Sequence, residues 1–171
     1  MRELILGGVR SGKSALAEQR AQESGLPVTY IATATAGDEE MAARIAHHRQ
    51  RRPGAWRIIE EPLHLAAALR ESAVADQLII VDCLTLWLTN LLLAEDASLS
   101  GREQNALLEL LPSLPGQIVL VSNEVGLGIV PLGELSRRFA DEAGRLHQQL
   151  ATRCEQVTFV AAGLPLTLKG S

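Results

Sequence analysis

The sequence contains few aromatic residues, few cysteines and almost no lysine. Two Trp, one Tyr and two Phe are too few for a platform on which nucleic-acid bases stack, and a net charge of −4 gives no overall basic field for nucleic acid. Cys83 and Cys154 stand in no CxxC or Cys/His spacing, which disfavours a zinc site and a disulfide framework. No apolar run reaches the ~18 residues of a membrane span, and no signal-peptide apolar region follows Arg2 and Glu3. We therefore expect a cytoplasmic protein that neither binds nucleic acid nor spans a membrane.

The remaining composition is that of an ordinary globular protein. With 171 residues, 47% hydrophobic and 21% charged, the chain is predicted to form a single domain over residues 1–171. Apolar runs and helix-forming stretches alternate along it. We expect strands over 3–6, 28–32, 56–59, 77–81, 118–121 and 157–161, the last being the final strand, and helices over 14–24, 38–51, 63–73, from 84 onward, within 95–115 (a short one) and after 131.

Two patterns indicate how these elements pack. The strands at 78–81 and 118–121 are apolar throughout, as in parallel sheets covered on both faces. In the longest helix, six apolar residues recur at helical spacing and predict one core-facing stripe: Leu132, Leu135, Phe139, Ala143, Leu146 and Leu150. The sequence therefore predicts an α/β fold with a mostly parallel sheet.

The scarcity of lysine draws attention to one motif. Of the sixteen lysine and arginine residues only Lys13 and Lys169 are lysines, and Lys13 lies in a match to GxxxxGK[ST]. In this phosphate-binding loop (P-loop), glycines let backbone N–H groups face phosphate oxygens, the lysine reaches the β- and γ-phosphates, and the hydroxyl holds Mg²⁺. Roughly 0.001 matches are expected by chance from this composition. The motif comprises Gly7, Gly8, Val9, Arg10, Ser11, Gly12, Lys13 and Ser14.

P-loop folds usually also place an acidic residue at the end of a buried strand, where it supports the Mg²⁺ shell. Asp82 directly follows the apolar run 78–81. The alternative is that Asp82 caps the helix that starts near residue 84, and the two roles are compatible. We expect Ser14 and Asp82 to hold the metal.

His47 and His48 stand beside a cluster of arginines at 49, 51 and 52. One interpretation is a solvated, basic helix end that complements the helix dipole. The other is a histidine nucleophile that attacks phosphorus, with arginines binding the remaining phosphates. Neighbouring residues on a helix point about 100° apart, so one histidine of the pair is expected to face a given site.

Polar residues also follow two other strands, where ligands of α/β sheets bind. Residues 122–131 form a polar, glycine-rich loop, interpreted as part of the site rather than as a simple connection. Thr33 and Thr35 are either site residues or helix caps. His64 and His147 are expected at the surface or partly buried, and Cys83 is expected to be a small buried residue.

Taken together, several segments resemble one family, the bifunctional adenosylcobinamide kinase/adenosylcobinamide-phosphate guanylyltransferases of cobalamin biosynthesis. The resemblance spans nearly the whole chain, and its most specific parts are the segment around His47 and His48 and the loop SNEVGLGIVP. The matching segments are LGGVRSGKS (6–14), YIATA (30–34), DEEMAARIAHHRQRRP (38–53), VDCLTLWLTNLL (81–92), VSNEVGLGIVP (121–131) and FADEAGRLHQQLA (139–151).

The resemblance implies two reactions. A nucleoside triphosphate, ATP or GTP, first phosphorylates the aminopropanol hydroxyl of adenosylcobinamide; GMP from GTP is then carried by a histidine, here His47, to the new phosphate. It also implies a RecA-like P-loop domain, Mg²⁺ and a homo-oligomer, possibly a trimer. Some relatives have Glu at the position of Asp82, which keeps the carboxylate. Besides the P-loop and Asp82, the implied nucleotide contacts are Ala32, Thr33, Ala34, His48, Arg49, Gln50, Arg51 and Glu60.

Two other functions match the P-loop alone. A single-activity small-molecule kinase would leave His47 as a surface residue. A nucleotide-dependent switch would hydrolyse the triphosphate slowly and transfer nothing. The His-His-Arg segment and the loop at 122–131 count against both, through the resemblance.

Overall fold

The apolar runs of the sequence form strands of one sheet, and helices connect most of these strands along the chain. The computed structural model describes residues 1–34 and 56–170. Its strands are β1 (Arg2–Gly7), β2 (Val28–Ala32), β3 (Arg57–Glu60), β4 (Leu78–Asp82), β5 (Gln117–Asn123), β6 (Gln156–Ala161) and β7 (Leu164–Lys169). They lie in the order β3-β2-β4-β5-β1-β6-β7, and every neighbouring pair is parallel except β6 and β7.

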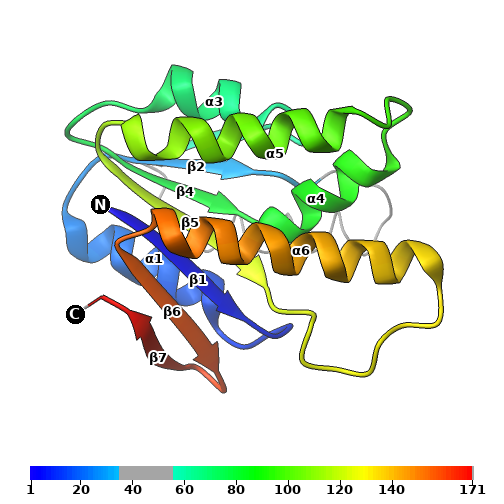
Figure 1. Ribbon diagram of the computed structural model, residues 1–171. Helices are drawn as coiled ribbons and strands as arrows, with labels where there is room; N and C mark the ends of the chain where they lie inside the picture. Colours follow the sequence, from blue (N-terminus) through cyan, green and yellow to red (C-terminus); the bar gives the residue numbers. More distant parts are fainter. Residues whose placement is uncertain (35–55, 171) are drawn as a thin grey trace.

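Helices cover both faces of the sheet (Figure 1). They are α1 (Lys13–Ser24), α3 (Leu65–Ser72), α4 (Leu84–Leu93), α5 (Leu99–Leu110) and α6 (Glu134–Arg153), with a 3₁₀ turn η1 (Leu111–Ser113) after α5. Ala17 and Ala21 of α1 pack on one face of the sheet, whereas Trp87 of α4 and Leu146 of α6 pack on the other. The predicted parallel sheet with helices on both faces is confirmed.

The prediction that 157–161 is the last strand is wrong. A tight turn at Ala162 and Gly163, with φ of 52° and 80°, reverses the chain into β7. Positive φ at both central residues is typical of two-residue hairpins, which usually carry Asn-Gly or Asp-Gly there, so Ala-Gly gave little signal. Pro165 is compatible with β7 because this is an edge strand.

The prediction of a core-facing stripe on the longest helix is correct only for the second half of the stripe. Ala143, Leu146 and Leu150 are buried, but Leu132 is 98% exposed and Leu135 is 52% exposed. Helix α6 begins at Glu134, so Leu132 lies in the preceding loop. Periodicity marks an apolar face and does not show whether the domain itself covers that face.

The region 95–115 forms a helix of 12 residues, α5, rather than a short one. The helix expected at 38–51 lies outside the described residues. Within 1–34 and 56–170, no helix has both the length and the apolarity required to cross a bilayer.

Candidate nucleotide site

The P-loop connects the carboxyl end of β1 to the first turn of α1, as the motif requires. Gly7 has φ of 155°, and a Cβ built there would lie 2.3 Å from the Val160 carbonyl oxygen. Gly12 has φ of 105° and Arg10 has φ of 55°. The loop can take this shape because residue 7 is glycine, at a position where the backbone of Val160 leaves no room for a side chain.

Lys13 is buried at the start of α1. Its Nζ donates a hydrogen bond to the Gly8 carbonyl at 2.6 Å and lies 3.4 Å from Ser11 Oγ. Burial lowers the pKa of the Lys13 ammonium, and the nearby charge of Asp82 partly opposes this effect. The ammonium is thus held inside the loop, at the N-terminus of a helix, where phosphate is favoured.

The hairpin turn between β6 and β7 supports the loop from outside. The Gly163 N–H donates to the Ser11 carbonyl at 2.8 Å, and a Cβ on Gly12 would lie 3.1 Å from Gly163 Cα. Since β7 was not expected from sequence, this support was missed as well.

Asp82 ends β4, two strands from β1. Tyr30 donates its phenolic hydrogen bond to Asp82 Oδ2 at 2.6 Å, and the Tyr30 ring stacks on Trp56 with 6.5 Å between ring centroids. The N-cap of α4 is Cys83, which is buried as expected, so Asp82 does not cap the helix. One carboxylate oxygen is therefore oriented by Tyr30.

Thr33 is fully buried and joins the ends of β2 and β4. Its Oγ1 donates to the Cys83 carbonyl at 2.7 Å and accepts the Cys83 N–H at 2.9 Å. Asn90 Nδ2 donates to the Thr33 carbonyl at 2.8 Å. The Thr33 hydroxyl thus holds two strand ends together. Ala32 pairs with Glu60 at the end of β3, so both lie at the same edge of the sheet as Asp82.

The loop after β5 reaches the P-loop directly. Asn123 pairs with Gly7 in the sheet, and the Glu124 N–H donates to the Gly7 carbonyl at 2.9 Å. Asn123 Nδ2 donates to Thr85 Oγ1 at 3.1 Å, which connects the loop to the first turn of α4. The structure thereby brings this loop to the P-loop and to the end of β4.

The remaining predicted site residues lie outside the described part of the chain: Thr35, His47, His48, Arg49, Gln50 and Arg51. The described chain resumes at Trp56, which stacks on Tyr30. Sequence reasoning missed the role of Tyr30. The available signal was the position of Tyr30, an aromatic residue with a hydroxyl group two positions before the end of β2, the strand that pairs with β4.

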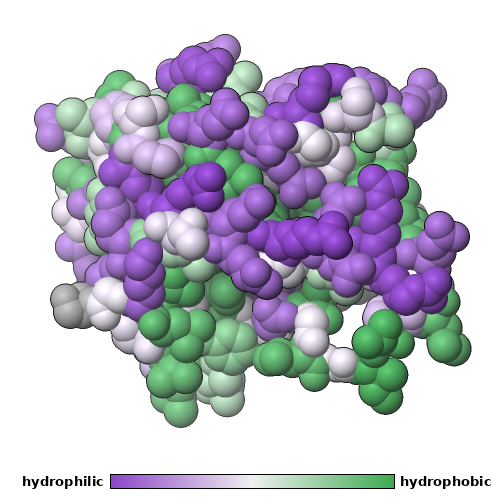
Figure 2. All heavy atoms as spheres, viewed as in Figure 1, coloured by the Kyte–Doolittle hydropathy of each residue, from purple (hydrophilic) through white to green (hydrophobic). Residues whose placement is uncertain are grey.

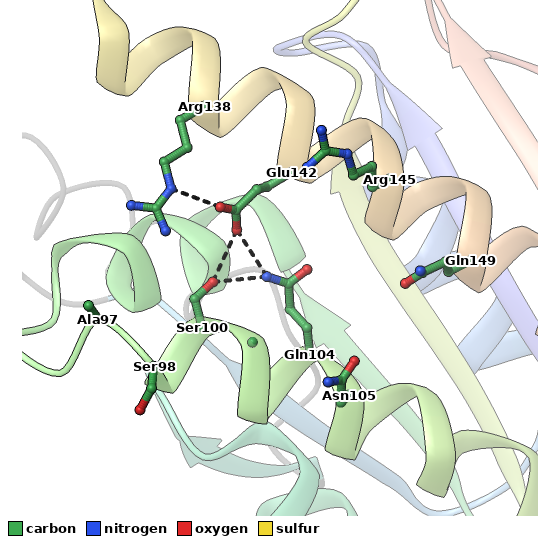
Figure 3. A pocket seen from close by; sticks show the side chains of 10 residues that line it. Ala97, Ser98, Ser100, Gln104, Asn105, Arg138, Glu142, Arg145 and Gln149 are labelled. Atoms are coloured by element: carbon green, nitrogen blue, oxygen red, sulfur yellow. Dashed lines mark hydrogen bonds and ion pairs between the residues drawn. The ribbon is translucent and has the colours of Figure 1, made fainter.

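Figure 3 shows a different feature, an open polar groove between α5 and α6. Arg138 pairs with Glu142 at 2.9 Å, and Glu142 also accepts hydrogen bonds from Ser100 and Gln104. The described residues that line it include no member of the P-loop or of the strand ends around Asp82. The groove is therefore separate from the site above, and the polar groups of Arg138, Glu142, Ser100 and Gln104 bind one another.

Comparison with solved structures supports the fold alone. The RadB recombinase matches with a TM-score of 0.51 and 16% identity, covering 92% of this chain and 73% of that one. The Pyrococcus horikoshii protein PH0250 matches with a TM-score of 0.53 and 10% identity, covering 99% and 86%. These matches confirm the expected RecA-like P-loop fold.

Sequence relatives are much more similar. The bifunctional adenosylcobalamin biosynthesis protein CobP of Pseudomonas aeruginosa is 67% identical over 170 residues, which cover 99% of this chain and 98% of the relative. The CobU proteins of Escherichia coli and Salmonella typhimurium are 39% and 38% identical, each covering 97% of this chain and 98% of the relative. The family model described as cobinamide kinase / cobinamide phosphate guanyltransferase matches residues 3–168. The chain therefore belongs to the cobinamide kinase / cobinamide phosphate guanyltransferase family.

Proposed function

We propose that this chain carries out both reactions for which its family is named. In the first, a nucleoside triphosphate phosphorylates the aminopropanol hydroxyl of adenosylcobinamide. In the second, GMP from GTP is transferred to that phosphate, which yields adenosyl-GDP-cobinamide and pyrophosphate. The observation that carries the proposal is the P-loop with a buried lysine beside a strand-end carboxylate, Lys13 and Asp82, in a chain whose whole length matches this family.

The P-loop supplies positioning and charge for phosphoryl transfer. Backbone N–H groups of residues 7–14 and the N-terminus of α1 bind the phosphate oxygens. The Lys13 ammonium, which donates to the Gly8 carbonyl, exchanges this partner for a phosphate oxygen when the nucleotide binds. Because Lys13 is already desolvated, it gives up little hydration when phosphate binds.

The donor set at this edge also fits Mg²⁺. This ion takes hard oxygen ligands and usually binds through one or two protein groups together with substrate phosphates and water. The hydroxyl of Ser14 and the carboxylate of Asp82 are such groups, and Tyr30 occupies one oxygen of Asp82 and leaves the other available. When bound, Mg²⁺ neutralises charge on the phosphates.

We further propose that His47 is the nucleophile of the second reaction, supported by the resemblance of its segment to the family. A ring nitrogen of His47 forms a bond to the α-phosphorus of GTP, the bond from that phosphorus to the α,β-bridging oxygen breaks, and pyrophosphate leaves. A phosphate oxygen of cobinamide phosphate then displaces the histidine. His48, Arg49, Gln50 and Arg51 contact the nucleotide, and the arginines neutralise its phosphates.

A labelling experiment tests the nucleophile. Incubation with GTP labelled at the α-phosphorus, followed by denaturation in alkali, should leave label on the protein, because a phosphoramidate resists base and is cleaved by acid. We expect His47→Ala to abolish the label and His48→Ala to retain it. Equal labelling of His47→Ala, or loss only in His48→Ala, would contradict the assignment.

We also propose that the chain forms a homo-oligomer, with a trimer as the state that the resemblance implies. Figure 2 shows hydrophobic residues gathered along the lower edge, over β7 and the loop before α6. Leu164, Leu166 and Leu168 of the edge strand β7 are all more than half exposed, and an exposed edge strand of this kind favours pairing with another chain. Light scattering at micromolar concentration should report an oligomer that Leu166→Lys weakens; a monomeric wild type would refute the proposal.

A further inference from the structure

A chain of three polar side chains extends from the phosphate site into the core. Ser122 Oγ lies 2.7 Å from His147 Nε2 in a buried contact, and His147 Nδ1 lies 3.7 Å from Glu124 Oε2. The exposed fraction of the side chain is 8% for His147 and 22% for Glu124, and Ser122 is fully buried. None of these residues has a role in the function proposed above. His147 was expected at the surface or partly buried, and as a whole residue it is 6% exposed.

The partners of the imidazole define its tautomer. Burial lowers the pKa of His147, although the Glu124 carboxylate partly opposes this, so the ring is neutral at neutral pH and carries a single N–H. A carboxylate only accepts hydrogen bonds, whereas a serine hydroxyl also donates. The arrangement therefore favours N–H on Nδ1, facing Glu124, with the Ser122 hydroxyl donating to Nε2.

The backbone fixes Glu124 beside the P-loop. Its N–H donates to the Gly7 carbonyl, and the Gly126 N–H donates to its Oε1. A Cβ on Gly126 would lie 2.9 Å from that oxygen, so a side chain at this position would push the carboxylate aside. Glu124 is thus held by two backbone groups and approached by His147 from α6.

Four acidic residues stand at, or directly after, the carboxyl ends of the described parallel strands, and they differ in place. Glu61 directly follows β3, and its carboxylate accepts hydrogen bonds from two backbone N–H groups ahead of α3. Glu60 ends the edge strand β3, and Asp82 ends β4, with one oxygen bonded to Tyr30. Glu124 directly follows β5, the strand between β4 and the P-loop strand β1. It is the carboxylate of this set that adjoins the P-loop and has no part in the proposed metal site.

We propose that Glu124 accepts the proton of the acceptor hydroxyl in the kinase reaction, and that His147 is a positioning residue that aims the Glu124 carboxylate. This inference rests on the proposed function. The acceptor oxygen forms a bond to the γ-phosphorus, and the bond from that phosphorus to the β,γ-bridging oxygen breaks. The nucleoside diphosphate leaves with the electron pair, and the hydroxyl proton moves to Glu124.

The two reactions of the same protein provide the test, because only the first deprotonates a hydroxyl. Kinase turnover is measured with adenosylcobinamide and γ-labelled ATP or GTP, and GMP transfer to the protein is measured with α-labelled GTP. Glu124→Gln should lower the kinase kcat at least 100-fold, with KM for the nucleotide within about threefold of wild type. GMP labelling and the thermal midpoint should be retained.

His147 variants separate positioning from packing. In His147→Leu the group that faces Glu124 is lost, and we expect the kinase kcat to fall about tenfold, in line with a small misplacement of a reacting group. His147→Asn keeps an N–H donor near the place of Nδ1 and should recover most of this loss. If both variants lose the same kcat, or if only their stability changes, His147 has no positioning role.

The outcomes separate this inference from the proposed function. Absence of kinase activity in the wild-type chain would overturn both, whereas an active wild type with unchanged kcat in Glu124→Gln would overturn the inference alone. Equal loss of kinase activity and GMP labelling in Glu124→Gln would also overturn it, because Glu124 would then only anchor the loop. If Glu124→Gln does not fold, Gly126→Ala, which displaces the carboxylate, decides: a tenfold lower kinase kcat with normal labelling supports the inference, and an unchanged kcat refutes it.

Discussion

Replacing Gly7 by alanine tests whether the shape of the P-loop depends on its neighbours as well as on its own sequence. A Cβ at Gly7 would lie 2.3 Å from the Val160 carbonyl oxygen and 2.7 Å from Ser11 Oγ. Ser11 has a flexible side chain, but Val160 is backbone and pairs with Gly7 in the sheet. The clash is therefore relieved only by moving β1 away from β6.

Two costs add at this position. Overpacking of a closely packed site costs about 1–3 kcal/mol, and holding a non-glycine residue in a backbone region that only glycine favours costs about 1–3 kcal/mol. We expect Gly7→Ala to lower the free energy of unfolding by about 3 kcal/mol. For a chain of this size this corresponds to a fall of about 6–12 °C in the thermal midpoint.

Gly8 provides a matched control within the same loop. A Cβ at Gly8 meets no atom within 4 Å, and its φ lies outside the range that side chains avoid. Gly8→Ala should therefore change the free energy of unfolding by less than about 1 kcal/mol. Urea unfolding followed by circular dichroism measures both variants. Equal stability of Gly7→Ala and Gly8→Ala would refute the argument from packing.

Three further measurements test the described contacts. Trp87 is fully buried and its indole N–H donates to the Leu63 carbonyl at 2.8 Å, so Trp87→Ala should lower the free energy of unfolding by about 3–5 kcal/mol, and a loss below about 1 kcal/mol would contradict its core position. The Glu103 carboxylate, whose Oε1 lies 3.0 Å from His64 Nδ1, raises the pKa of His64. The contribution of this pair to stability is present below pH 6.5 and is lost as the pH rises through the folded pKa. The substitution Glu103→Gln should therefore lower the pKa of His64, which an NMR titration measures. Burial raises the pKa of Cys154 to about 12, so alkylation at pH 8 should be far slower in the folded than in the denatured chain, and equal rates would show an exposed thiol.

Local patterns were sufficient to predict most of the fold. The strands at 78–81 and 118–121 were recognised because continuous apolar runs suit a sheet buried on both faces. The P-loop was recognised because its glycines, lysine and serine occur at a fixed spacing between a strand and a helix. In each case the evidence lies within about ten residues of sequence, which is the range over which backbone preferences act.

Contacts between distant segments were not predictable in the same way. The apolar spacing that includes Leu132 and Leu135 is identical whether those side chains meet the core or solvent, and only the tertiary structure exposes them. His147 lies on the same helix as buried leucines, but the sequence does not show that Ser122 and Glu124 face its ring. The hydrogen bond from Tyr30 to Asp82 joins residues 52 positions apart.

These long-range contacts matter most at the phosphate site, where the β6–β7 hairpin and the end of β5 hold one short loop. The Gly163 N–H bonds the Ser11 carbonyl, and the Glu124 N–H bonds the Gly7 carbonyl, while the Val160 carbonyl excludes any side chain from Gly7. The motif thus provides the groups that bind phosphate, and the β6–β7 turn and the end of β5 hold their backbone in place before the nucleotide arrives. Because such preorganisation avoids reordering the loop when the ligand binds, residues that never contact phosphate are expected to influence how tightly it is held.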